Sequence, residues 1–320
     1  MTFLQLSYIV AVSEEKSISR AAEKLHVAQP SISRLITSLE QEYGVKLFRR
    51  SAHNVELTYA GKIFVEHAQL LLTQQRNLDS ILHDLGHSHQ GKLTFGCSSN
   101  HIGYMLPPLL QRLNLAFPYL EISVVNDTSV NLLRQTAMGK IDLIYTHTPL
   151  EKNEELHYIP VTQEELLLVV PCTHPLARRA EAEPDWRKRR SVQLREIAGE
   201  PFIQLRKNHS IRILTDQLFR EHGFSPSVRL DSSSNGVAHK LVSSGLGVSI
   251  LPESELRFNP TDPPCVFFPI EDRSYTRQIF IGCQKSLYPT TVITSCIDIV
   301  TDIAQNIFVE GSQAGSQAEA

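Results

Sequence analysis

The stretch from Ser17 to Glu42 constrains the fold of this chain more than any other part. Two short amphipathic segments are joined by a tight connection at residues 26–28, and Pro30 stands where the first turn of a helix accepts proline. The second segment carries an apolar stripe that consists of Ile32, Leu35, Ile36 and Leu39. Its opposite face has short polar side chains and one arginine, Arg34. This spacing predicts two helices, of which the second turns one face to a core and the other to a partner.

The polar face of the second helix fits the major groove of DNA. Arginine can pair with guanine and glutamine with adenine, while hydroxyl groups reach phosphates. An ordinary surface helix carries a similar pattern. The tight connection before this helix and the segment after it favour a DNA-reading helix-turn-helix from about Ile18 to Thr37.

The segment that follows has the pattern of a two-stranded wing. Gly44 is expected to end the helix, and Val55 and Leu57 alternate with polar residues after a polar tip at 51–54. We expect Lys46, Arg49 and Arg50 to be available to phosphates. The predicted DNA-binding residues are Ser17, Ser19, Arg20, Gln29, Pro30, Ser31, Ser33, Arg34, Thr37, Arg49, Arg50 and His53.

Composition sets limits on the rest of the chain. With 320 residues, 42% of them hydrophobic, the chain can form more than one core. Its net charge is -3, which still allows a small DNA-reading domain to be joined to a larger acidic domain. We find no membrane-spanning apolar run, and the first residues lack the features of a signal peptide, so we expect a cytoplasmic protein. Five scattered cysteines predict reduced thiols, without a zinc site or a disulfide framework.

A long helix is predicted from the cap at Thr58 to about Leu85. Its apolar residues keep a heptad-like spacing that Gln75 interrupts. The members of this seam are Phe64, Ala68, Leu71, Leu78, Leu82 and Leu85. The seam could pack on its own domain or on a second chain. Residues 86–91 then form a hinge, and we expect His87 and His89 in it to be solvated rather than to bind a metal.

From residue 92 onward, strand and helix patterns alternate, which predicts an α/β fold with a mostly parallel sheet. The charged segment at 177–195 mixes arginines with acidic residues and is interpreted as an exposed, solvated loop. The last residues are small and polar, as in a disordered tail.

The motifs of the first sixty residues occur together in one family. This part of the chain closely resembles the LysR-type transcriptional regulators, and residues 92–305 resemble their two-lobed effector domain. The segments that carry the N-terminal resemblance are 19–22, 25–27, 29–33, 39–40, 44–50 and 57–61.

The resemblance implies an α/β protein with an N-terminal all-α winged helix-turn-helix and a two-lobed periplasmic-binding-protein-like effector domain. The expected boundaries are 1–58 for the winged helix-turn-helix, 59–90 for the linker helix and hinge, 91–307 for the effector domain and 308–320 for the tail. Within that domain, lobe I takes about 91–161 and 268–307, and lobe II about 162–267. The implied partners are promoter DNA, an anionic small-molecule effector, further copies of the chain in a homodimer or homotetramer, and RNA polymerase.

An effector would be expected where strands end in hydroxyl-rich turns, because ligands of open α/β sheets gather at the carboxyl ends of strands. Matching positions in the family imply effector contacts at several of these turns. The candidates are Ser98, Ser99, Asn100, Thr128, Thr146, Gln204 and Ser232. Plain helix capping is the alternative role for such side chains. Cys97 beside the first turn raises a redox-responsive alternative, although a buried cysteine is favoured.

The common enzyme motifs are absent from the sequence. The sequence has no Gly-x-Ser-x-Gly, no phosphate-binding loop, no Gly-x-Gly-x-x-Gly and no His-Glu-x-x-His. We therefore predict no catalytic residue, no metal and no cofactor. An exported solute-binding protein would share the second half of the fold but not the DNA-reading segment. A ligand-independent DNA-binding protein would have no use for two lobes.

Overall fold

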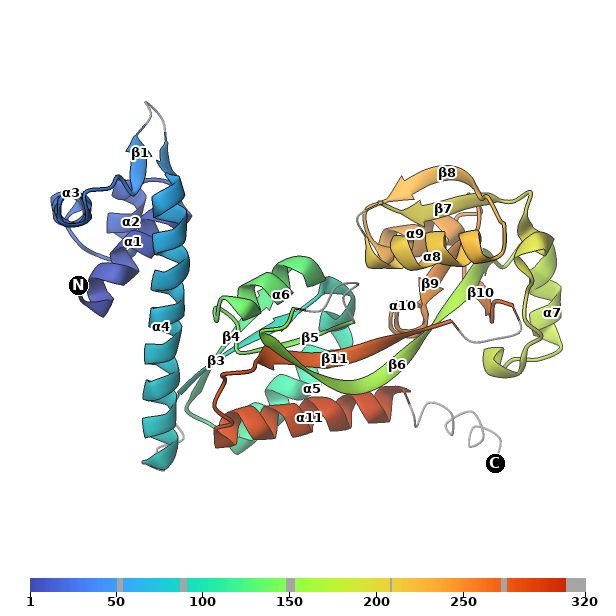
Figure 1. Ribbon diagram of the computed structural model, residues 1–320. Helices are drawn as coiled ribbons and strands as arrows, with labels where there is room; N and C mark the ends of the chain where they lie inside the picture. Colours follow the sequence, from blue (N-terminus) through green and yellow to red (C-terminus); the bar gives the residue numbers. More distant parts are fainter. Residues whose placement is uncertain (51–53, 87–90, 148–152, 208, 272–274, 309–320) are drawn as a thin grey trace.

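The structure is a computed structural model. It describes residues 1–50, 54–86, 91–147, 153–207, 209–271 and 275–308. Figure 1 shows a helical head packed beside one long helix, followed by two α/β lobes that are joined by two long strands.

The head consists of three helices and a two-stranded wing. Its elements are α1 (Phe3–Glu15), α2 (Ile18–Lys24), α3 (Gln29–Tyr43), β1 (Phe48–Arg50) and β2 (Val55–Leu57). Ile32, Ile36 and Leu39 of the predicted stripe are buried in the core of the head, and Leu35 is half-buried. Gly44 ends α3 in the left-handed conformation, as its position predicts.

Helix α4 (Tyr59–Leu85) begins where the sequence predicts, because Thr58 Oγ1 accepts a hydrogen bond from Gly61 N at 2.9 Å. Val65 is buried in the core of the head, and Ala68 one turn farther along α4 is also buried. Farther along the helix, three leucines of the predicted seam lie in solvent in the single chain. Leu71, Leu78 and Leu82 are 45%, 54% and 58% exposed. The side chain of Leu85 lies outside the described residues.

Lobe I forms the middle of the molecule (Figure 1). Its elements are β3 (Gly91–Cys97), α5 (Ser99–Ala116), β4 (Leu120–Asn126), α6 (Ser129–Ala137), β5 (Leu143–His147) and α11 (Thr291–Phe308). Helices α5 and α11 share one hydrophobic core with Phe95 and Tyr145 of the sheet, whereas α6 packs on Ile144 and Phe280 in another. Alternate residues of the strands thus face opposite layers.

Lobe II carries a second, smaller sheet. Its main elements are β7 (Pro201–Leu205), α8 (Ser210–Glu221), β8 (Ser227–Ser232), α9 (Asn235–Ser243), β9 (Ser249–Pro252), α10 (Glu253–Phe258) and β10 (Cys265–Phe268). β7 and β8 are parallel, and one hydrophobic core spans the lobe.

Two strands run through both lobes: β6 (Leu156–Pro171) and β11 (Thr276–Gln284). Val161 of β6 belongs to the core of lobe I, whereas Leu166 and the residues after it belong to the core of lobe II. The segment between them, which includes Glu164, therefore lies at the junction of the lobes.

The expectation of a mostly parallel sheet is wrong for the large sheet, whose main strand order is β10-β6-β11-β5-β3-β4. Within the described part of this sheet, only β3 pairs in parallel, with β4 and β5, while β11 is antiparallel to β5 and β6. The reason is that β6 carries the chain out of lobe I and β11 brings it back. The two crossing strands consequently run in opposite directions.

The charged segment at 177–195 is more ordered than the sequence suggests. It contains α7 (Arg178–Glu181) and a 3-10 turn, η2 (Trp186–Lys188). The Arg189 guanidinium donates to the carbonyl oxygens of Glu183, Phe267 and Pro184 at 2.8 Å each. The interpretation as a solvated loop is therefore wrong for this arginine, because its hydrogen bonds tie the segment to lobe II.

Candidate nucleic-acid interface and inter-lobe site

The predicted DNA-binding side chains lie mainly on the outer face of the head. Gln29, Pro30, Ser31, Arg34 and Thr37 are exposed on α3, and Ser33 is half-buried. Ser19 and Arg20 are exposed on α2, and Arg49 is exposed on β1. The side chain of Arg50 and the whole of His53 lie outside the described residues.

Several of these side chains are held in place within the head. Arg34 Nε donates to Pro30 O at 3.3 Å, and Thr37 Oγ1 donates to Ser33 O at 3.0 Å. Ser17 is the N-cap of α2, so its hydroxyl accepts a hydrogen bond from Arg20 N. These local bonds orient the Arg34 and Thr37 side chains along α3 and stabilise the start of α2.

Glu40 is a positioning residue that sequence reasoning did not identify. It is 8% exposed, and its Oε1 accepts hydrogen bonds from the amides of Leu47 and Phe48 at 2.9 and 3.2 Å. Its Oε2 lies 2.6 Å from Lys46 Nζ. Burial alone would raise the pKa of Glu40, but these hydrogen bonds outweigh burial and lower it. Glu40 thus fixes the start of the wing against α3, and Lys46 is engaged in an ion pair rather than simply available to phosphates.

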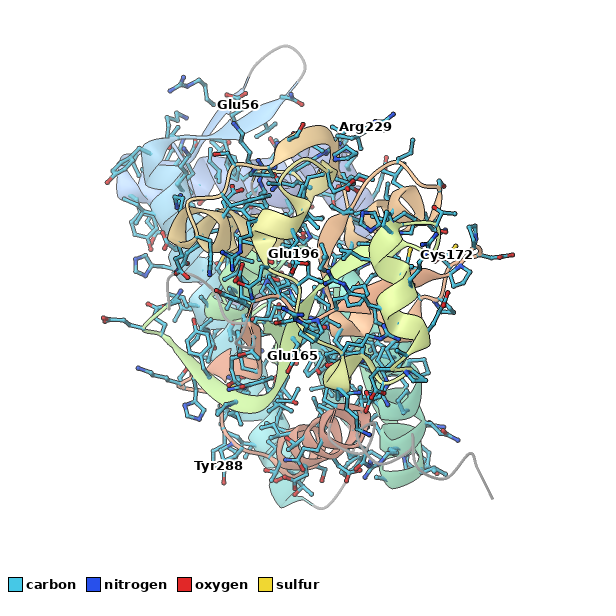
Figure 2. All side chains as sticks on the ribbon, turned by 90° about the vertical axis from the view of Figure 1, so that its right-hand side faces the viewer. Glu56, Glu165, Cys172, Glu196, Arg229 and Tyr288 are labelled. Atoms are coloured by element: carbon cyan, nitrogen blue, oxygen red, sulfur yellow. The ribbon has the colours of Figure 1, made fainter. Side chains whose placement is uncertain are left out.

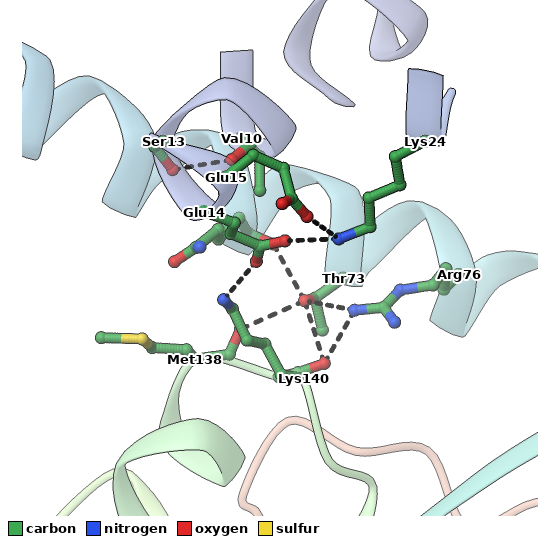
Figure 3. A network of polar contacts seen from close by, with 11 residues as sticks. Val10, Ser13, Glu14, Glu15, Lys24, Thr73, Arg76, Met138 and Lys140 are labelled. Atoms are coloured by element: carbon green, nitrogen blue, oxygen red, sulfur yellow. Dashed lines mark hydrogen bonds and ion pairs between the residues drawn. The ribbon is translucent and has the colours of Figure 1, made fainter. Parts of the chain in front are cut away.

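Lobe I contacts both α4 and the head (Figure 3). Arg76 Nη2 donates to Gly139 O at 2.8 Å, and Thr73 Oγ1 lies 3.2 Å from the same carbonyl oxygen. Beside them, Lys140 Nζ lies 2.7 Å from Glu14 Oε1 of α1. The loop after α6 therefore touches both α4 and α1 of the head.

The predicted effector contacts fall at the carboxyl ends of strands in both lobes. Ser98, Thr146, Gln204 and Ser232 are buried, and Thr128 is exposed. The side chains of Ser99 and Asn100 lie outside the described residues.

Some of these groups have partners within the protein and others do not. Thr146 Oγ1 lies 2.7 Å from Ser129 Oγ, and Ser232 Oγ donates to Ser234 O at 2.8 Å. Thr128 caps α6 through Asn131 N. By contrast, both amide atoms of Gln204 and the hydroxyl of Ser98 are buried without a hydrogen-bond partner in the described structure.

A buried ion pair on the crossing strands was also missed. Arg277 Nε donates to Glu164 Oε2 at 2.6 Å, and the two side chains are 3% and 0% exposed. The sequence carries little signal for this pair, because polar residues flank both charges: Gln163 and Glu165 lie beside Glu164, and Thr276 and Gln278 lie beside Arg277. Burial would raise the pKa of Glu164, but the Arg277 guanidinium and further groups lower it.

Neutral histidines surround this pair. Burial lowers the pKa of His101 to about 4, and it lowers that of His209 to about 4, with Arg277 adding to the effect in both. Burial and then Arg277 hold the pKa of His147 well below its usual range. The site therefore combines one ion pair with imidazoles that are uncharged at neutral pH.

Comparisons with known proteins assign this arrangement to a family. Residues 3–62 match the family model of the bacterial regulatory helix-turn-helix proteins of the lysR family. Residues 86–305 match the LysR substrate binding domain. The chain is a LysR-type transcriptional regulator. Like the family, the regulator combines a DNA-binding helix-turn-helix with an effector-binding domain.

Full-length relatives agree with this assignment. The regulator is 30% identical over 318 residues to an uncharacterized regulator of Bacillus subtilis, YcgK, with 96% of each chain covered. Its fold matches a full-length OxyR variant from Pseudomonas aeruginosa with a TM-score of 0.74 at 24% identity and 95% coverage of each chain. It also matches full-length CbnR complexed with its target DNA with a TM-score of 0.64 at 22% identity, covering 95% and 100% of the two chains.

The regulator's cysteines bear on the redox-responsive alternative. Cys97 is fully buried, and burial raises its pKa far above the ordinary value, which disfavours the reactive thiolate. Cys172 is exposed at the end of β6 and is labelled in Figure 2.

In the described part of the regulator, no helix has both the length and the apolarity to cross a membrane.

Proposed function

We propose that this regulator binds promoter DNA as a homodimer, with α3 of each subunit in a major groove. The observation that carries the proposal is the exposed polar face of α3, next to the wing that starts at Phe48. Base contacts are assigned to Gln29 and Arg34, and phosphate contacts to Ser31, Thr37 and Arg49, because these side chains are exposed on α3 and on β1 of the wing.

The seam of α4 supports dimerisation. Leu71, Leu78 and Leu82 leave an apolar surface in solvent that a second α4 would bury. A dimer places two reading helices on two half-sites, which gives one small head useful affinity. Association of two such dimers would give the homotetramer.

The effector is assigned to the inter-lobe site. Buried polar atoms without partners in the described structure, such as those of Gln204, support a ligand there, because such atoms are costly unless a ligand or water satisfies them. Binding would change the position of one lobe relative to the other. Through the contacts of Gly139 and Lys140, it would also change the position of the head relative to lobe I. We place the regulator in the cytoplasm, without enzymatic activity, and assign RNA polymerase as a partner at the promoter.

The test is DNA binding by the full chain to a fragment obtained by in vitro selection. Arg34→Ala is expected to weaken specific binding by roughly 1–3 kcal/mol and competitor binding less, because one base contact is lost. Arg195→Ala, an exposed arginine in lobe II, is the control and should bind as the parent does. Equal losses on specific and competitor DNA would contradict base reading by Arg34.

A further inference from the structure

The Glu164–Arg277 pair lies where both crossing strands pass from one lobe core to the other. The two residues face each other across the antiparallel β6–β11 ladder. Glu164 Oε1 also accepts a hydrogen bond from Ser254 N in lobe II at 3.1 Å. The carboxylate is thus fully engaged, because each of its oxygens has a donor.

The guanidinium is only partly engaged. Nε serves Glu164, but Nη1 and Nη2 of Arg277 are buried and have no hydrogen-bond partner in the described structure. Buried terminal amino groups of arginine without acceptors are strongly unfavourable, so a group that accepts from both is expected in the working protein. An oxyanion fits, since a guanidinium presents parallel N–H groups at the spacing of carboxylate or phosphate oxygens.

Other buried polar groups of the two lobes also lack partners. Among the described residues, His101 Nε2 and His147 Nδ1, both on lobe I, are buried without partners, as are the amide atoms of Gln204 and Asn235 on lobe II. These imidazoles and amides can each donate or accept. A purely apolar ligand would leave them unsatisfied, and a cation would be repelled by Arg277.

We propose that the inter-lobe site takes a small organic anion whose oxyanion group binds Nη1 and Nη2 of Arg277, and whose other polar groups bind the amides and imidazoles of both lobes. This inference rests on the proposed effector function and specifies the ligand class. Carboxylate and phosphate share the chemistry that Arg277 recognises, so the experiment separates them. Because the ligand contacts both lobes, it would hold them in one relative position.

The experiment is thermal unfolding of the full chain with acetate, succinate, inorganic phosphate or sulfate at millimolar concentration, each against sodium chloride of equal ionic strength. At least one oxyanion is expected to raise the unfolding midpoint by about 2–4 °C when its concentration is roughly ten times its Kd. A response to acetate or succinate alone assigns a carboxylate, and one to phosphate alone a phosphate. The absence of any anion-specific shift would overturn the proposal.

Variants locate the effect. Arg277→Lys keeps a charge for Glu164 but lacks the paired N–H groups, and Glu164→Gln combined with Arg277→Gln removes both buried charges together. Both variants are expected to fold and to lose the anion shift, whereas Arg229→Gln, an exposed arginine of β8, should retain it. Retention of the shift in both Arg277 variants would overturn the proposal.

DNA binding by the same samples separates this inference from the proposed function. If the chain binds selected DNA and responds to a neutral or cationic metabolite but to no oxyanion, the regulator stands and the ligand class is wrong. If the chain binds no DNA specifically, the proposed function fails irrespective of the anion result.

Discussion

Lys140 Nζ of lobe I lies 2.7 Å from Glu14 Oε1 of α1, so the head and the effector-binding domain touch directly as well as through α4. The two side chains are 32% and 38% exposed, and a pair of this kind contributes less than about 1 kcal/mol. The larger constraint is the neighbouring contact between Gly139 and Thr73, which has no room for a further carbon atom.

Gly139→Ala is expected to disrupt this contact. Gly139 has φ +68, and an added Cβ would lie 2.2 Å from Thr73 Cγ2. Gly223→Ala is the matched control, because Gly223 has φ +60 but open space around it. We expect Gly139→Ala to lose roughly 1–3 kcal/mol more stability than the control, with faster hydrogen exchange in α4 near Thr73. Equal losses in the two variants would show that the contact does not hold α4 against lobe I.

Glu40→Ala is expected to destabilise the head by roughly 2–4 kcal/mol, because the amides of Leu47 and Phe48 lose their acceptor. Lys46→Ala should change the free energy of unfolding by less than about 1 kcal/mol, since its ammonium group is largely in solvent. Urea unfolding measures both. A loss in Lys46→Ala as large as that in Glu40→Ala would assign the effect to the ion pair instead of the amides.

Acidification is expected to destabilise the two-lobed domain between about pH 6.5 and pH 4. The folded-state pKa of His101 is lowered to about 4 from 6.5, so the unfolded chain binds the proton first and stability falls as pH falls through this range. His101 alone would contribute roughly 3 kcal/mol over the full range. Urea unfolding at several pH values should show a shallower dependence in His101→Asn. His157→Gln, an exposed residue of β6, should leave the dependence unchanged.

Leu78→Asp combined with Leu82→Asp is expected to convert the chain to monomers and to reduce affinity for two-half-site DNA. Both leucines are more than half exposed on α4, so the substitutions leave the single chain's core intact. Sedimentation at micromolar concentration measures the assembly. Leu115→Asp, on a still more exposed leucine of α5, is the control. A dimer that survives the double substitution would exclude this seam as the interface.

The sequence by itself determined the local elements. Pro30, Gly44 and Thr58 mark helix ends through backbone geometry and capping, and these depend only on neighbouring residues. The apolar period of α3 likewise determined which of its faces is buried. These features were sufficient to predict the helix-turn-helix and the long helix after it.

Tertiary structure decided what depends on residues far apart in the chain. Glu164 and Arg277 are separated by 113 positions, and only the antiparallel pairing of the crossing strands places them together. The same holds for Gly139 against Thr73 and for Glu14 against Lys140, where distant loops and helices meet. Local patterns carry no information on such pairings, because strand order and lobe packing are set by burial summed over the whole chain.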